Sequence, residues 1–167
     1  AVAAAQQALA AAENFEDANE ALIKFFQEES LVKENDAKTL LSAIHAAIAD
    51  TTADRPAPSL LNLMTERGLS STEKSLALLV EKTRLHFVPI SIYEVDPAKA
   101  SSLEKEFCLK HLVLPFDQIS KTLLVATANP FDARAKHHVE GHIEGRVQWF
   151  LADPLDLSKT IKDVFRL

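Results

Sequence analysis

Three histidines in one short segment, His137, His138 and His142, form the only cluster in this sequence whose side chains suggest chemistry. His138 and His142 are four residues apart, so on a helix both rings project from the same side, as in helical metal sites. No spacing rule places Cys108 or Asp153 beside them as a third ligand. The alternative is a solvent-exposed helix flank whose charge depends on pH. We therefore expect no metal site, and His138 and His142 are the only metal candidates.

Catalytic residues are not evident elsewhere. Cys108 follows Phe107 at the end of an expected helix, and we interpret it as a small buried hydrophobic residue, because no base is placed near it. The three glycines Gly68, Gly141 and Gly145 are too few and too scattered to build a phosphate-binding loop. No paired carboxylates, nucleophile triad or oxyanion loop can be assigned. The sequence thus predicts no catalytic site and no cofactor.

Composition narrows the possible partners. The 167 residues carry a net charge of −6 and are 47% hydrophobic, which is enough for one large core or two small ones. The negative charge argues against binding to nucleic acids or directly to anionic membranes. The apolar runs are shorter than a membrane span, and the Ala-rich start lacks the basic flank of a signal peptide. A lone cysteine excludes an internal disulfide and fits a reducing compartment.

An acidic set occupies the first expected helix. Its members are Glu16, Asp17, Glu20, Glu28 and Glu29. Such a set is ordinarily a solvated helix face. The alternative is a surface for a basic partner, where charge complementarity sets orientation and association rate.

The pattern of the segment 112–151 predicts a small sheet with one helix. Two runs rich in Val and Leu, Leu112–Phe116 and Thr122–Thr127, are separated by the polar DQISK, which predicts a hairpin with a five-residue loop. A helix then opens at Asn129-Pro130, and Val147–Leu151 forms a third strand. Strand, helix and strand in one sheet imply a right-handed crossover and a parallel pair. Trp149 in this strand is expected to pack in the core or on a sheet face.

Three helix starts share one device. Asp96-Pro97, Asn129-Pro130 and Asp153-Pro154 each place a capping side chain directly before a proline, which suits the first helical position. We therefore predict helices beginning at 97, 130 and 154, with Asp132 and Asp156 in their first turns. Their expected buried stripes are Ala100, Leu103 and Phe107; Phe131, Ala135, Val139 and Ile143; and Leu157, Ile161, Val164 and Phe165.

The N-terminal part contains an internal repeat. A shift of 38 residues places Leu22 on Leu60, Phe26 on Met64, Ser30 on Gly68 and Leu31 on Leu69. Each copy is predicted as a helix, a short turn and a second helix, so two similar helical hairpins should pack together. In the second copy Gly68 fits a helix C-cap, and Ser70 with Glu73 resembles a capping box.

These patterns define an α+β fold. A helical subdomain of two repeated hairpins precedes a small ββαβ sheet subdomain with flanking helices. The proline-rich segment 54–58 is expected to be a linker, and the segment 86–93, HFVPISIY, an extended connector. The predicted division is 1–55 for repeat one, 56–95 for repeat two and the connector, and 96–167 for the ββαβα part.

Residues 58–167 also carry a series of motifs in a fixed order. They are LLNLMTERGLSS, FVPI, Asp96-Pro97, EFCLKHLVLPF, LLVATANPFD and VQWFLADPLDL. In this combination the chain resembles the N-terminal domain of the type II secretion ATPase, general secretory pathway protein E. The same module, called MshEN, occurs on type IV pilus assembly ATPases.

The resemblance implies a non-catalytic adaptor that lies ahead of an ATPase core, and ATP would bind only in that core. The module would dock the motor to the cytoplasmic domain of an inner-membrane platform protein. Its partners would then be that domain and the remainder of the ATPase chain. It would be cytoplasmic and peripheral at the inner membrane, meeting the membrane only through its partner.

Some members of this family bind cyclic di-GMP through two copies of the motif RLGxxLVxxGLIxxxxLxxxLxxQ. Here the Arg of the motif falls on Ala21 and Ser59, and its first Gly falls on Ile23 and Leu61. Neither Ala nor Ser replaces the bidentate contact of an Arg, and a side chain at the Gly position blocks close backbone approach. The motif positions that survive are Leu22, Phe26, Leu31, Leu60, Met64, Gly68 and Leu69.

We therefore interpret the repeat as retained for packing and docking. The alternative is a cyclic di-GMP or other nucleotide sensor that regulates such a motor. A third possibility is an adaptor fused to an unrelated domain.

Overall fold

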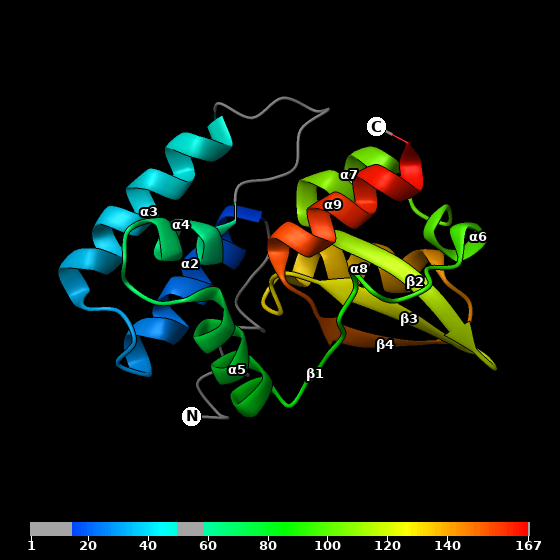
Figure 1. The fold of residues 1–167 in the computed structure, drawn as a ribbon, viewed down its shortest axis with the longest axis horizontal. Coiled ribbons are helices and arrows are strands. Elements are labelled where there is room, and N and C mark those ends of the chain that lie inside the picture. The colour runs from blue at the N-terminus through cyan, green and yellow to red at the C-terminus, as the bar shows by residue number, and fades with distance from the viewer. Residues whose placement is uncertain (1–14, 50–58, 167) are drawn as a thin grey trace.

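The computed structural model describes residues 15–49 and 59–166 of the chain (Figure 1). The N-terminal helices are α2 (Phe15–Glu28), α3 (Glu34–Ala49), α4 (Leu60–Glu66) and α5 (Thr72–Thr83). They are followed by β1 (His86–Phe87), α6 (Pro97–Ala100), α7 (Lys105–His111), β2 (Val113–Ile119), β3 (Thr122–Thr127), α8 (Ala133–His142), β4 (Arg146–Leu151) and α9 (Pro154–Phe165). The expected α+β fold is confirmed. The Ala-rich opening and the 54–58 linker lie outside the described residues.

The predicted repeat is confirmed down to its hydrogen bonds. The first helices of the two hairpins end at Glu28 and Glu66, and the 38-residue shift relates these positions. The turns use left-handed residues at equivalent places, Ser30 with φ 62° and Gly68 with φ 71°. The N–H of Leu31 donates to Phe26 at 2.9 Å, and that of Leu69 donates to Met64 at 3.0 Å. Both helices therefore end in the same Schellman-type arrangement.

The capping box predicted at Ser70 and Glu73 is wrong by one residue. Ser71 is the N-cap of α5, and its side chain accepts from the N–H of Lys74 at 3.2 Å. Ser70 instead points its hydroxyl to the carbonyl of Ser71. Because Ser is suited to both positions, composition alone does not choose between them.

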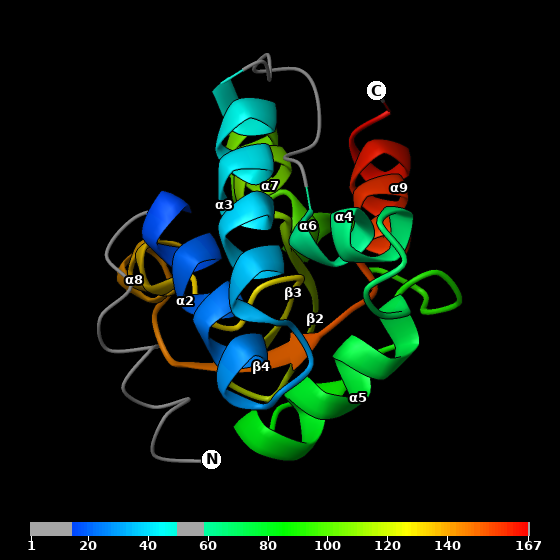
Figure 2. The same cartoon turned by 90° about the vertical axis from the view of Figure 1, so that its left-hand side faces the viewer.

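The four helices pack around an apolar core in which α3 contacts both α2 and α4 (Figure 2). Phe25, Phe26, Leu40 and Met64 are almost completely buried there. Phe131 and Leu151, from the sheet part, belong to the same core. The two parts of the chain are thus joined by shared apolar packing.

The sheet has four strands in the order β1-β4-β3-β2. β2 and β3 form the expected antiparallel hairpin, and β3 and β4 the expected parallel pair. Two expectations were wrong. Pairing continues to Ile119 opposite Thr122, so only Ser120 and Lys121 form the hairpin turn, and the register shifts at Phe116. The connector starting at His86 contains a fourth strand, β1, which pairs with β4 in parallel, and then turns at residues 90–92.

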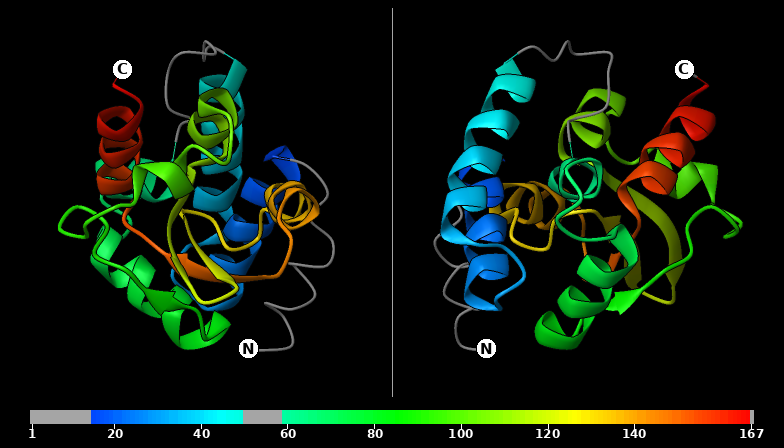
Figure 3. Two further views of the ribbon diagram at one scale, coloured as in Figure 1. Left: turned by 90° about the vertical axis from the view of Figure 1, so that its right-hand side faces the viewer. Right: turned by 60° about the vertical axis from the view of Figure 1, so that its left-hand side comes forward.

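Two of the three helices that were predicted to begin at a proline do so. α9 begins at Pro154 with Asp153 as its cap, and α6 begins at Pro97 with Asp96 as its cap. α6 ends at Ala100, however, so the predicted stripe through Phe107 is divided between α6 and α7. α7 and α9 contact each other and β2 (Figures 1 and 3).

The helix predicted at Pro130 begins three residues later. Asp132 is its N-cap and accepts from the N–H of Ala135, whereas Asn129 accepts from the N–H of Phe131 and forms a separate turn. Phe131 and Ile143 therefore lie outside α8, and only Ala135 and Val139 of the expected stripe are buried on it. None of the helices in the described ranges is long and apolar enough to cross a bilayer.

Two glycines provide a matched test of the fold. Gly145 has φ +107°, and a Cβ there would lie 2.6 Å from the backbone oxygen of Lys121 in the hairpin turn. Gly145→Ala should lower the free energy of unfolding by about 2 kcal/mol or more, since strain and a backbone clash add. Gly141, on α8, has nothing within 4 Å of such a Cβ. Gly141→Ala should raise stability by up to about 1 kcal/mol.

The measurement is urea unfolding of both variants followed by circular dichroism. Equal stability of the two variants would mean that the α8–β4 loop does not approach the hairpin turn closely.

Candidate functional site

The surviving motif positions lie together in the helical part. Leu22 and Phe26 on α2, with Leu60 and Met64 on α4, are no more than 2% exposed and form part of one apolar core. Leu31 and Leu69 are half-buried against that core, and Gly68 is exposed in its turn. These side chains contact one another, so their apolar character is explained by packing.

A small cavity lies beside these positions. Its lining combines Asn19, Leu22, Ser59, Leu60 and Leu61 of the helical part with His111, Leu112, Ala128 and Asn129 of the sheet part. The cavity volume is about 20 Å³, enough for about one water molecule. Pockets for small-molecule ligands are typically about 300–1,000 Å³. A dinucleotide does not fit into this cavity.

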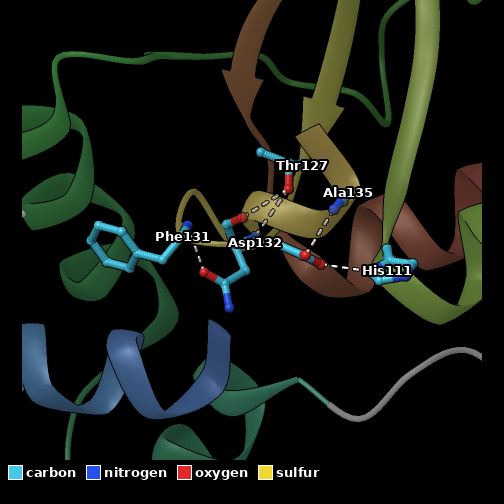
Figure 4. Close-up of polar contacts among 6 residues, drawn as sticks. His111, Thr127, Phe131, Asp132 and Ala135 are labelled. Atoms are coloured by element: carbon cyan, nitrogen blue, oxygen red, sulfur yellow. Dashed lines mark hydrogen bonds and ion pairs between the residues drawn. The ribbon is translucent and has the colours of Figure 1, made fainter. Parts of the chain in front are cut away.

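His111, which lines the cavity, also belongs to a buried polar junction. Figure 4 shows the contacts of this junction. The carboxylate of Asp132 is 2.6 Å from Nδ1 of His111, and the two side chains are 1% and 5% exposed. Its second oxygen accepts from the N–H of Ala135 at 3.0 Å and caps α8. One carboxylate thus fixes the end of α7 against the start of α8. No spacing in the sequence relates His111 to Asp132, although an Asp directly before a helical segment was a signal for the cap.

The histidine candidates form an aromatic row. Phe107 lies between His111, at 4.7 Å, and His138, at 4.2 Å, and the rings of His138 and His142 are 4.2 Å apart. Nδ1 of His142 is 2.8 Å from the carbonyl oxygen of His138. Burial, followed by the nearby His142 and His111, lowers the pKa of His138. Within the described part of the chain, no group of three His, Cys, Asp or Glu side chains is arranged to hold a metal ion.

Two single residues behave as expected from their types. Cys108 is fully buried, and burial raises the pKa of its thiol to about 12, so it is not an activated nucleophile. Trp149 is 8% exposed, donates from Nε1 to Glu140 at 3.3 Å and has Lys136 over its ring. The acidic set is only partly described: Glu20 and Glu28 are exposed, and Glu29 lies 3.9 Å from Lys82 of α5.

A larger groove lies between α5 and the start of α9. Its volume is about 530 Å³, and its floor contains apolar residues of α5 together with Phe87 of β1. Three carboxylates, those of Glu73, Asp153 and Asp156, complete the lining. This groove could not be predicted from the sequence, because the segments that form it are distant in the chain. Its shape and lining suit an apolar surface bearing positive charge.

Comparison with known proteins gives a family and a fold. The MshEN domain family model matches residues 83–167, slightly more than half of the chain. The structure of MshE with cdg (cyclic di-GMP) aligns with a TM-score of 0.59 at 19% identity, covering 86% of this chain and 97% of that one. Two crystal structures of the N-terminal domain of XpsE give TM-scores of 0.53 and 0.54 at 17% and 18% identity. Each covers 84% of this chain and 91% of the XpsE chain.

No curated protein sequence matches the chain. At these identities, the likeness to the solved structures establishes a shared fold.

The polar junction predicts an unequal pair of cap deletions. Asp132→Ala removes a helix cap and the partner of His111 Nδ1 in a buried site, so the free energy of unfolding should fall by about 2–4 kcal/mol. The side chain of Asp153 caps α9 by accepting from the N–H groups of Leu155 and Asp156. Asp153→Ala removes only this cap and should lower the free energy of unfolding by about 1 kcal/mol. Urea unfolding of both variants at one pH gives the comparison. A smaller loss for Asp132→Ala than for Asp153→Ala would contradict the role of the junction.

The depressed pKa of His138 predicts a pH-dependent stability. The unfolded chain binds a proton near the ordinary histidine pKa of about 6.5, and the folded chain binds it only at lower pH. Stability from His138 is therefore present above about pH 6.5 and is lost as the pH falls through the folded-state pKa. His138→Gln should reduce the loss of unfolding free energy between pH 7.5 and 5.5. The control is His137→Gln, at an exposed position on the same helix.

If the free energy of unfolding of His138→Gln depends on pH in the same way as that of the wild type and of His137→Gln, burial of His138 does not cause the pH dependence of stability.

Proposed function

The chain belongs to the MshEN domain family, and on this basis we propose that it is the non-catalytic docking domain of a type II secretion or type IV pilus assembly ATPase. In this role it binds the cytoplasmic domain of an inner-membrane platform protein and positions the motor beneath it. The domain is then cytoplasmic and peripheral at the inner membrane. ATP binding and hydrolysis belong to a separate catalytic part of the motor.

The packing of the repeat carries this proposal. Four of the surviving nucleotide-motif positions, Leu22, Phe26, Leu60 and Met64, are buried in the apolar core, and the cavity beside them has a volume of only about 20 Å³. Ala21 and Ser59 stand where the motif has its Arg, so the charge-assisted contacts to guanine and phosphate are missing. The buried side chains of the repeat then give the domain a rigid support, and the platform protein binds to an exposed surface of the domain.

Cyclic di-GMP sensing is the second candidate. Its support is the likeness to MshE, whose structure includes cdg, over 86% of this chain. The family model matches residues 83–167, which contain neither copy of the motif, so this match does not distinguish docking from cyclic di-GMP sensing. In this alternative a ligand that contacts the side chains at the motif positions would have to disrupt the core in which Phe26 and Met64 are buried, exposing them to water at a large cost in free energy.

Calorimetric titration distinguishes the two functions. We expect no heat of binding when the chain, at tens of micromolar, is titrated with cyclic di-GMP, and none with ATP as the control. Immobilised chain should retain the cytoplasmic domain of the platform protein encoded by the same secretion or pilus system. Binding of cyclic di-GMP with a dissociation constant in the micromolar range or below, about −8 kcal/mol, would favour the sensor instead.

A further inference from the structure

The two hairpins share a backbone but differ on one helix face. The 38-residue shift that aligns their turns places Leu76, Ala77 and Val80 of α5 on Lys38, Thr39 and Ser42 of α3. All three α3 residues are polar and exposed. On α5, Leu76 joins the core, whereas Ala77 is exposed and Val80 is half-buried. The hairpin fold therefore does not require the apolar character of this face.

An aromatic side chain extends the same apolar face. Phe87 of β1 lines the groove and is 46% exposed. Leu155, on the first turn of α9, lies between the groove carboxylates Asp153 and Asp156 in sequence and is 63% exposed. Phe87 is thus a large apolar side chain exposed at a groove, which is typical of an interaction surface.

The ionisable side chains that line the groove are all acidic. Its ionisable lining residues are Glu73, Asp153 and Asp156. None of them takes part in the ion pairs found among the described residues. Asp153 caps α9 through one oxygen, Oδ1, and within residues 15–49 and 59–166 no Lys or Arg forms an ion pair with its carboxylate. A ligand with positive charge beside an apolar surface would complement this lining, whereas nucleic acid and anionic lipid would be repelled.

We propose that this groove, lined by Glu73, Leu76, Ala77, Val80, Phe87, Asp153 and Asp156, binds a basic amphipathic helix of the partner protein. The inference rests on the docking function proposed above and assigns it a surface. Apolar residues at positions i, i+3 or i+4, and i+7 of the partner helix would enter the groove. Flanking Lys or Arg side chains would reach the three carboxylates. A helix suits the groove better than an added strand, because β1 offers an edge of only His86 and Phe87.

The test uses a designed probe. A fluorescent, helix-forming peptide with Leu at helical spacing and Lys on both flanks is titrated with the chain and followed by anisotropy. The comparison peptide has Glu at every Lys position. We expect the Lys peptide to bind at least tenfold more tightly than the Glu peptide. Equal affinities would overturn the proposal.

Matched variants locate the site. Ala77→Arg fills the groove and adds positive charge, and Thr39→Arg makes the same change of charge at the equivalent exposed position of α3. Phe87→Ser removes the exposed aromatic. Ala77→Arg and Phe87→Ser should each weaken binding of the Lys peptide at least tenfold, and Thr39→Arg should leave it within twofold of the wild type. Circular dichroism and urea unfolding establish that each variant is folded.

A pull-down with the platform cytoplasmic domain separates this inference from the proposed function. If the wild type binds the domain and Ala77→Arg binds it equally well, the groove assignment is wrong and the docking function stands. If no variant and no wild-type chain binds the domain, the docking function fails. Self-association of the chain that Ala77→Arg abolishes would identify a second copy as the occupant and would overturn the proposed partner.

Discussion

The turn from Ala128 to Asp132 holds the two halves of this protein together. Asp132 uses one oxygen on the N–H of Ala135 and the other on His111, and so fixes α8 against α7 inside the sheet part. One residue earlier, Phe131 enters the helical core, where its ring lies 5.4 Å from that of Phe25. A polar contact on one side and an aromatic contact on the other are thus made by adjacent residues, so neither core can shift without straining the turn.

The repeat shows how a duplicated backbone can carry different surfaces. Both hairpins close with a left-handed residue and the same backbone hydrogen bonds, and these features depend on local geometry. Their second helices differ where they meet the rest of the molecule. α3 presents Lys38 and Thr39 to water, whereas α5 lies near β1 and α9 and contributes to the groove. Two hairpins with the same turn geometry can therefore differ in role, one serving mainly as support and the other as a contact surface.

Much of the structure that depends on neighbours in the chain was predictable from the sequence. The repeat, the Asp153 cap, the β2–β3 hairpin and the parallel β3–β4 pair follow from local spacing and chirality. The start of α8 was predicted three residues too early, because Asn129-Pro130 and Asp132 are both competent caps and the choice depends on Phe131 packing against a distant helix.

Strand β1 was missed for the same reason. Two residues give no periodic pattern, and they become a strand only by pairing with β4. The groove and the pair of His111 with Asp132 likewise join segments that no spacing rule relates. The motif positions can be assigned from the sequence, but whether they line a ligand site depends on how the helices that carry them pack together.

The short pairing of β1 also has a consequence for the motions of the sheet. β1 is held to β4 by two register pairs and by the bond from Val88 to Leu151, between segments separated by most of the sheet part. An edge with so few bonds should open locally at a lower cost in free energy than β3, which is paired along both sides, so the amide hydrogens of β1 should exchange sooner than those of β3. Opening would displace Phe87, and an occupant that requires Phe87 in place would suppress it. The rate of amide exchange in β1 would thus report whether the groove beside it is occupied.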